Sequence, residues 1–231
     1  NLYKEIIKTK ILALGSFFSN RVSINKIKKN YITYISCFKP SYLTDEVLCG
    51  DIKYTYLKNE DVKILKNLKN YIKKNNETLK IIAKSGNEKF LEEKKFYYKI
   101  FGKQNVEVIK NKGHENSFKI TDQSKLVIGN DSTMAFECFA RGSKVLFIYR
   151  FASKKEIFKS KVFFWPNPAM SEGPFWINDG NYFKIESKIK KLIKLSNKEW
   201  SEINFQYKKK IMCFDKNNEI LKNKIRKLLF S

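Results

Sequence analysis

A short turn followed by a helix-like segment carries the residue types best suited to chemistry in this chain. The sequence LVIGNDSTMAFECFARG spans residues 126–142, and its first hydrophobic run stops at a glycine. Glycine allows close approach of a ligand to the backbone, and a helix that begins just after it offers free N–H groups and a partial positive charge. Such a turn is typical of a phosphate site, to which two hydroxyls can add hydrogen bonds. The candidate phosphate-binding residues are Gly129, Asn130, Asp131, Ser132 and Thr133.

One acidic residue, Glu137, interrupts the apolar run Met-Ala-Phe-Glu-Cys-Phe-Ala that follows the turn. It lies four residues after Thr133 and therefore on the same helix stripe. A carboxylate placed one turn below a phosphate site is suited to accept two hydrogen bonds from a ribose diol. In the alternative, structural interpretation, residues 130–132 only cap the helix, and the negative charge of Glu137 only interacts favourably with the helix dipole near the amino terminus. A buried carboxylate without a partner would be costly, which favours the ligand-binding interpretation.

Alternating strand and helix patterns surround this turn. Strands are predicted at 31–36, 78–85, 105–110, 125–129 and 144–150, where β-branched and aromatic residues gather. Helices are predicted at 60–74, 87–102 and 132–142. This order predicts an α/β fold, a three-layer Rossmann-like domain with a parallel sheet of about five or more strands. Strand 126–129 should lie near the sheet's centre, and a capping box at Ser196 and Glu199 should open a helical C-terminal extension.

The composition limits the classes of function. The 231 residues carry a formal net charge of +24, which first suggests a nucleic-acid partner. Only four of the 47 basic residues are arginine, however, and base and phosphate readers rely on the planar guanidinium fork. Scattered lysines instead indicate a drift in composition or an anionic partner such as a membrane surface. We therefore expect no specific nucleic-acid binding.

The cysteines and the single histidine argue against metal and disulfide chemistry. Four separated cysteines form no C-x-x-C pair, so we expect no metal site, no cofactor and reduced thiols. The longest apolar runs are too short to cross a membrane, and the expected location is cytoplasmic, with peripheral contact at the inner face of the cytoplasmic membrane. The four cysteines are Cys37, Cys49, Cys138 and Cys213.

The turn and helix 126–148, together with EGPFWIND and LSNKEW further along, resemble the nucleotide-sugar-binding half of GT-B glycosyltransferases that build bacterial capsule and O-antigen. The resemblance covers about residues 11–205. It implies that Ser132 and Thr133 meet the donor phosphate and that Glu137 contacts the ribose. It also implies that Lys84, which ends the second strand, faces the diphosphate, although one lysine in a lysine-rich chain is a weak signal.

Several further residues are candidates for the cleft. Ser36, Cys37 and Phe38 end the first strand and are candidates for the loop that faces the cleft between two GT-B domains. His114 is followed by Glu115, whereas some related transferases have a His-Pro pair, so a histidine in a surface loop is the alternative. Glu172 and Trp176 either close over the donor or belong to a hydrophobic loop packed under the C-terminal helices. These candidates are Ser36, Cys37, Phe38, His114, Glu172 and Trp176.

The expected organisation is a remnant of an amino-terminal domain and linker at 1–30, a Rossmann-like domain at 31–195, and C-terminal helices at 196–231. The expected function is transfer of a sugar from a nucleotide-sugar to a glycan or glycolipid acceptor of a bacterial surface polysaccharide. The remaining part of such an enzyme would come from a missing amino-terminal domain or a partner chain. The alternatives are a non-catalytic nucleotide- or anion-binding module, or a basic RNA-associated protein.

Overall fold

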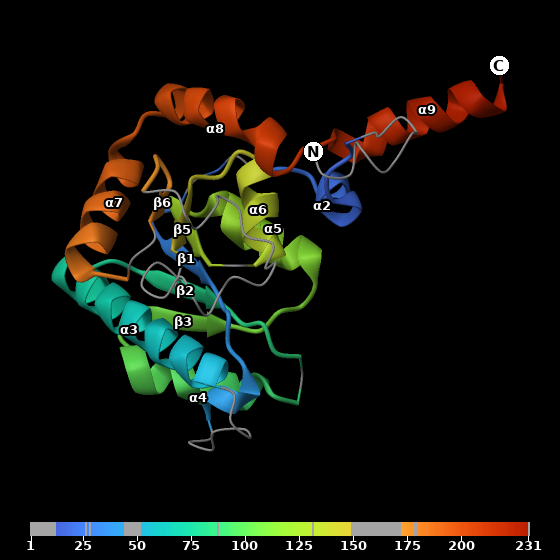
Figure 1. Ribbon diagram of the computed structural model, residues 1–231. Coiled ribbons are helices and arrows are strands. Elements are labelled where there is room, and N and C mark those ends of the chain that lie inside the picture. Colours follow the sequence, from blue (N-terminus) through green and yellow to red (C-terminus); the bar gives the residue numbers. More distant parts are fainter. Residues whose placement is uncertain are drawn as a thin grey trace.

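The sheet is parallel throughout the described part of the protein. The computed structural model describes residues 13–25, 27, 29–43, 52–86, 88–130, 132–148, 172–177 and 180–230. Within these ranges the strands form one six-stranded sheet in the order β3-β2-β1-β4-β5-β6 (Figure 1). The strands are β1 (Ile32–Ile35), β2 (Leu79–Ile82), β3 (Val106–Ile109), β4 (Leu126–Gly129), β5 (Val145–Ile148) and β6 (Trp176–Ile177).

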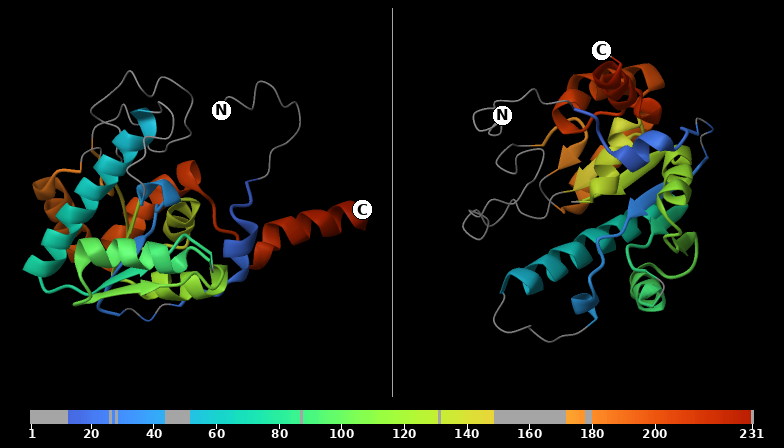
Figure 2. Two further views of the ribbon diagram at one scale, coloured as in Figure 1. Left: turned by 90° about the horizontal axis from the view of Figure 1, so that it is seen from below. Right: turned by 90° about the vertical axis from the view of Figure 1, so that its right-hand side faces the viewer.

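Helices cover both faces of this sheet (Figures 1 and 2). On one face α3 contacts α4 and α7, and on the other α6 contacts α5 and α8. This arrangement follows from the crossovers, because each parallel connection must return over a face of the sheet. The helices are α3 (Ile52–Lys74), α4 (Phe90–Phe101), α5 (His114–Gln123), α6 (Thr133–Ala140), α7 (Tyr182–Lys194) and α8 (Asn197–Ile211).

The core lies between the sheet and its two helical layers. Every residue of β1, β4 and β5 is buried, as expected for central parallel strands covered on both faces. Edge strand β3 alternates instead, with Val106 and Val108 buried and Glu107 exposed. On the α6 side, Phe139 packs on Phe175 with ring centroids 4.6 Å apart. The hydrophobic runs of the sequence are therefore used mainly to bury the sheet on both sides.

Short elements at the two ends of the described chain lie together. Helix α2 (Phe17–Arg21) contacts the turn η2 (Lys216–Asn218), from which the last helix α9 (Glu219–Leu229) projects (Figures 1 and 2). The amide of Asn20 donates to Asn218 Oδ1 at 2.8 Å, and Asn20 Oδ1 accepts from the Asp215 N–H at 3.0 Å. These buried hydrogen bonds join the start and the end of the described chain.

The segment before β1 is anchored by a buried arginine. Arg141 donates to both carboxylate oxygens of Asp122, at 3.1 and 2.5 Å, and to the carbonyls of Ser19, Val22 and Ser23 at 2.7, 2.8 and 3.2 Å. The planar guanidinium thus donates hydrogen bonds both to a buried carboxylate and to the backbone carbonyls of the segment before β1. Part of the stretch expected to be a polar linker, residues 20–30, is therefore held against the domain.

The predicted fold class is confirmed. Each of the five predicted strands contains an observed strand, and β4 lies inside the sheet between β1 and β5. Helix α3 begins at Ile52, earlier than the predicted 60–74, and two elements were missed, α5 and the two-residue β6. The loop given as the alternative position of His114 is not observed, because His114 is the exposed first residue of α5.

Candidate functional site

A cavity of about 510 Å³ opens beyond the carboxyl ends of β1, β2 and β3 and the start of α6. After β1 the chain continues to α3 on one face of the sheet, and after β4 it continues to α6 on the other face, so the connections from these two neighbouring strands separate here. In open α/β sheets this switch point is where ligands bind. Predicted residues that line the cavity are Ser36, Cys37, Lys84, His114, Ser132, Thr133 and Glu137. Lining residues that were not predicted are Ile35, Lys39, Ile82, Ala83, Asn111, Gly113, Ser117 and Met134.

Gly129 allows α6 to begin directly at the end of β4. A Cβ at this position would lie 2.5 Å from the Cβ of Ala135, so only glycine fits this close approach of strand and helix. Close packing against α6 is therefore a structural reason for a glycine here, beside the predicted role of leaving room for a ligand. Gly129 is not among the residues that line the cavity.

The amino terminus of α6 faces the cavity with Ser132 and Thr133. Ser132 is the N-cap residue, with extended backbone (φ −78°, ψ 127°), but its side chain makes no capping hydrogen bond. The side chain of Ser132 therefore does not act as a helix cap. The first turn of a helix has free N–H donors and a partial positive charge, which together attract an anion.

Glu137 lies one turn further along α6 and lines the same cavity. Its side chain is only 5% exposed. Among the described residues, no hydrogen bond or ion pair reaches its carboxylate. Among the described residues only Asn130 Oδ1 is a fully buried side-chain polar atom without a partner, so the carboxylate oxygens of Glu137 are open to the cavity. The arrangement therefore leaves a strong hydrogen-bond acceptor available to a ligand beside a site for anions.

A second buried acid, Glu93 on α4, shapes the opposite wall. Its Oε1 accepts from the Lys84 N–H at 2.9 Å and its Oε2 accepts from the Ser85 N–H at 2.7 Å. The hydroxyl of Ser36, at the end of β1, also donates to this carboxylate. Three donors from two strand-end loops satisfy the fully buried carboxyl group, so Glu93 fixes both loops of the cavity wall.

The hydroxyl of Ser36 is fully engaged in the hydrogen bonds of this network. Besides donating to Glu93, Ser36 Oγ accepts from the Phe38 N–H at 3.1 Å and lies 2.7 Å from Tyr97 Oη. Burial raises the pKa of Tyr97 well above its usual value, so the phenol stays protonated. Ser36 therefore supports the wall of the cavity, and Lys84 is the exposed cation that the same network holds at its rim.

The third wall comes from the loop between β3 and α5. Asn111 Oδ1 accepts from the Gly113 N–H at 2.9 Å and from Ser117 Oγ at 3.3 Å. Gly113 has a φ of 106°, a conformation that favours glycine. His114 follows, and its ring stacks on Phe18 at 5.2 Å between centroids. His114 thus stands between the cavity and a neighbouring hollow of about 400 Å³.

The other predicted residues lie away from the cavity. Phe38 is a core residue beside Phe96, and Trp176 is buried in β6 with its ring 5.8 Å from that of Tyr207 on α8. Packing under the C-terminal helices, the alternative given for this segment, fits Trp176. Glu172 pairs with Lys184 at 2.8 Å.

Asn130 points away from the cavity and into the protein. Its Nδ2 lies 3.5 Å from Asp61 Oδ1 on α3, and its buried Oδ1 has no partner among the described residues. Asp131 lies outside the described residues. The phosphate-binding roles of Gly129, Asn130 and Asp131 remain predictions.

Within the described ranges, no three His, Cys, Asp or Glu side chains come together to hold a metal ion. Nor does any helix in those ranges have the length and apolar character needed to cross a membrane. The expectation that the chemistry needs no metal or cofactor stays a prediction.

A parallel six-stranded sheet with helices on both faces defines a Rossmann-like α/β domain. Residues 1–229 match the profile of a family described as "putative O-antigen biosynthesis protein", and the chain belongs to this family. No curated protein matches the chain.

Solved structures share the fold. The UDP-GlcNAc 2-epimerase of Methanocaldococcus jannaschii, in complex with UDP-GlcNAc and UDP, superposes with a TM-score of 0.56 at 12% identity, over 100% of this chain and 57% of that one. A Listeria monocytogenes protein described as a "putative UDP-N-acetylglucosamine 2-epimerase" gives 0.51 at 11% identity, over 87% and 46%. The pneumococcal O-GlcNAc transferase GtfA, in complex with UDP and GlcNAc, gives 0.48 at 11% identity, over 95% and 39%.

These identities establish the fold alone, which is that of a parallel α/β domain like those in the two epimerase structures. The recognition made from the sequence is confirmed at this level. The chain spans about half the length of the solved structures it matches, with 57% and 46% of the two epimerase chains covered.

Proposed function

We propose that this chain is the donor-binding half of a glycosyltransferase that moves a sugar from a nucleotide-sugar onto a surface polysaccharide such as O-antigen. The observation that carries the proposal is the carboxylate of Glu137, which lines the cavity at the amino terminus of α6 without a hydrogen bond or ion pair from the described residues, on a residue that is only 5% exposed. Membership of an O-antigen biosynthesis family supports the same function.

The proposed pose follows from charge and hydrogen bonding. The diphosphate lies at the amino terminus of α6, where backbone N–H groups, Ser132 and Thr133 donate to its oxygens. Lys84 adds a positive charge from the rim of the cavity. Glu137 accepts from the two ribose hydroxyls one turn below. A cavity of about 510 Å³ has the size of a typical small-molecule site.

The same contacts provide a route to catalysis. When the sugar leaves, negative charge grows on the nucleoside diphosphate. Preorganised N–H groups, hydroxyls and a lysine stabilise this charge more strongly than the charge of the intact donor, which lowers the barrier. We propose that this stabilisation and the positioning of the donor need no metal ion. The acceptor, a glycan or glycolipid, would be held by an amino-terminal domain of a longer protein or by a partner chain.

The first test is a thermal-shift series with UDP, GDP, CMP and dTDP. A ligand that binds only the folded chain raises the melting temperature in proportion to the logarithm of its concentration. We expect at least one of these nucleotides to stabilise the chain, and its nucleoside to stabilise it less. If none of them changes the melting temperature at millimolar concentration, the cavity is not a nucleotide site.

The second test follows the sugar donor. We expect hydrolysis or transfer to be absent with the 231-residue chain alone, and to appear when an amino-terminal half is supplied. Analysis of the product distinguishes transfer to a glycan from a change within the sugar. Nucleotide binding that never leads to turnover in the longer protein would favour the non-catalytic module. RNA binding that survives Glu137→Gln would favour the RNA-associated alternative.

A further inference from the structure

The last helix, α9, presents a surface that the proposed nucleotide site does not use. It projects from η2 away from the α/β domain (Figures 1 and 2), and no side chain within it is buried. Helices of soluble domains usually bury an apolar stripe against the core, because packing rather than propensity stabilises them. An amphipathic helix that buries nothing therefore calls for an external partner surface.

The apolar residues of α9 form one continuous stripe. Leu221, Ile225, Leu228 and Leu229 follow the spacing i, i+4, i+7 and i+8, which places them on one helix face. Ile225 is 46% exposed, Leu228 68% and Leu229 70%. Phe230, just after the helix, is 85% exposed. These side chains together offer a large apolar area to a partner.

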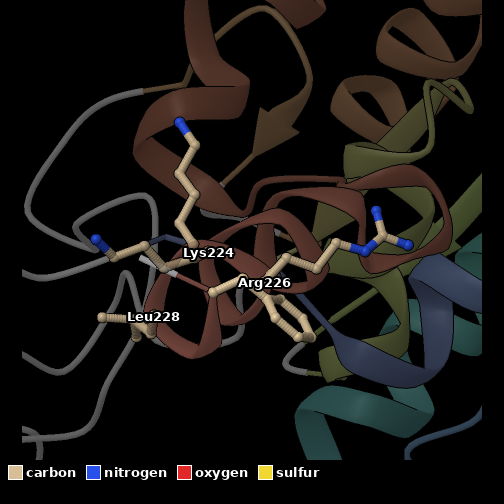
Figure 3. A pocket seen from close by; sticks show the side chains of 5 residues that line it. Lys224, Arg226 and Leu228 are labelled. Carbon is tan, nitrogen blue, oxygen red and sulfur yellow. The ribbon is translucent and has the colours of Figure 1, made fainter.

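Positive charge surrounds this stripe. Lys222 and Lys224 flank it, and Arg226 and Lys227 lie on the remaining face, against one acid, Glu219, which pairs with Lys222 at 3.2 Å. Figure 3 shows the side chains of Lys224, Arg226 and Leu228 leaving the helix in different directions. The face of α9 opposite the stripe thus carries more basic than acidic side chains, and Asn223 and the half-exposed Ile220 also lie there.

A second exposed apolar group adjoins the base of α9. Phe17 and Phe18 on α2 are 50% and 59% exposed, and the guanidinium of Arg21 lies 5.8 Å from the centre of the Phe17 ring. The Asn20–Asn218 hydrogen bond joins α2 to η2, and η2 leads into α9. The aromatic and basic side chains of α2 are therefore held near the start of α9.

The charge pattern decides which partner fits. A second copy of this chain would bring two cationic helices together, and the formal net charge of +24 opposes such self-association. An anionic lipid surface matches both features, since its headgroups attract lysine and arginine while its acyl boundary takes up an apolar stripe. We propose that α9 binds the surface of an anionic lipid bilayer, with its apolar stripe inserted and its basic side chains at the headgroups.

Vesicle co-sedimentation of the full chain tests this proposal. The probes are vesicles of equal parts phosphatidylglycerol and phosphatidylcholine, and vesicles of phosphatidylcholine alone. We expect binding to the anionic vesicles, and much weaker binding to the neutral ones. Equal binding to both compositions, or no binding to the anionic vesicles, would overturn the proposal.

The apolar contribution is tested with the triple variant Ile225→Ser, Leu228→Ser, Leu229→Ser. The control is Phe205→Ser on α8, where the phenylalanine is 62% exposed. We expect the triple variant to lower the partition coefficient by about tenfold or more, because each buried leucine or isoleucine contributes a large transfer energy. Its melting temperature should stay unchanged, since no side chain of α9 is buried.

The charge contribution is tested with Lys224→Gln, Lys227→Gln against the control Lys191→Gln, Lys198→Gln on α7 and α8. All four lysines are exposed, and both variants lose the same net charge. We expect a larger loss of vesicle binding for the α9 pair than for the control pair. Equal losses, or an unchanged partition of the triple serine variant, would mean that the scattered lysines of the whole surface bind lipid without α9.

Discussion

The carboxylate of Glu93 accepts a hydrogen bond from the backbone N–H of Lys84 at 2.9 Å, and this contact joins α4 to the rim of the cavity. Because the second carboxylate oxygen accepts from Ser85, both oxygens are committed to the loop after β2. The position of the Lys84 side chain over the cavity therefore depends on a buried acid from another element.

Glu93→Gln should weaken the binding of a nucleoside diphosphate by about tenfold, because an amide donor replaces one acceptor and the loop that carries Lys84 shifts. Nucleoside binding should change little. Glu92→Gln, an exposed neighbour on α4, is the matched control. The decisive comparison uses Lys84→Ala as the background, in which Glu93→Gln should have no further effect on diphosphate affinity. A full additional loss there would show that Glu93 does not act through Lys84.

Gly129→Ala should destabilise the fold by about 1–3 kcal/mol, because the added Cβ meets Ala135 at 2.5 Å and the packed turn cannot yield freely. Gly86→Ala is the control, since a Cβ there meets nothing within 4 Å. Urea denaturation measures both, and Ala135→Gly should restore much of the stability lost in Gly129→Ala. Equal effects of the two glycine substitutions would refute the packing explanation.

Arg141→Met should lower the free energy of unfolding by about 3–5 kcal/mol, because the buried carboxylate of Asp122 would lose the guanidinium that donates to both of its oxygens. The exposed Arg226→Met serves as the control. Combining Arg141→Met with Asp122→Leu should cost less than the sum of the single changes. Additive losses would show that the two side chains do not stabilise each other.

Stability at acidic pH should depend on Glu186 of α7. Hydrogen bonds from Lys190 and then Lys74 lower the pKa of Glu186 to about 2. A carboxyl with a lowered pKa stabilises the folded state above its unfolded pKa of about 4.5, and this contribution is lost as the pH falls from about 4.5 to about 2. Urea midpoints measured across this range should fall less steeply for Glu186→Gln than for the exposed control Glu202→Gln. Identical slopes would contradict the assignment.

The sequence was most informative where hydrophobic patterning determines structure. The runs that became β1, β4 and β5 are apolar on both faces, so their strands and parallel arrangement followed from the pattern. Helix α5 was missed because it buries polar side chains, among them Thr121 and Asp122, which leaves little apolar periodicity.

The two buried acids of the candidate site, Glu137 and Glu93, also differ in how readily the sequence reveals them. Glu137 was found because it interrupts an otherwise apolar helix. Glu93 lies among acids and lysines in FLEEKKF, and nothing local distinguishes it from the exposed Glu92. The rotation of α4 against the sheet decides which of the two is buried, and that is a tertiary property. For the same reason, the sequence could not show that Ser36 is saturated by Glu93 and Tyr97.

Isothermal titration calorimetry of the better-binding ribonucleoside diphosphate, UDP or GDP, and of its nucleoside tests the central claim most directly. Glu137→Gln should weaken both ligands, because both carry the ribose diol, while Ser132→Ala with Thr133→Ala should weaken only the diphosphate. Charge-assisted hydrogen bonds of this kind correspond to about ten- to hundredfold in affinity for each contact. Ser201→Ala on α8, an exposed serine away from the cavity, should bind both ligands as the parent does. Parental affinities for both ligands in all of these variants would contradict the claim that the turn and helix at 132–137 bind a nucleotide.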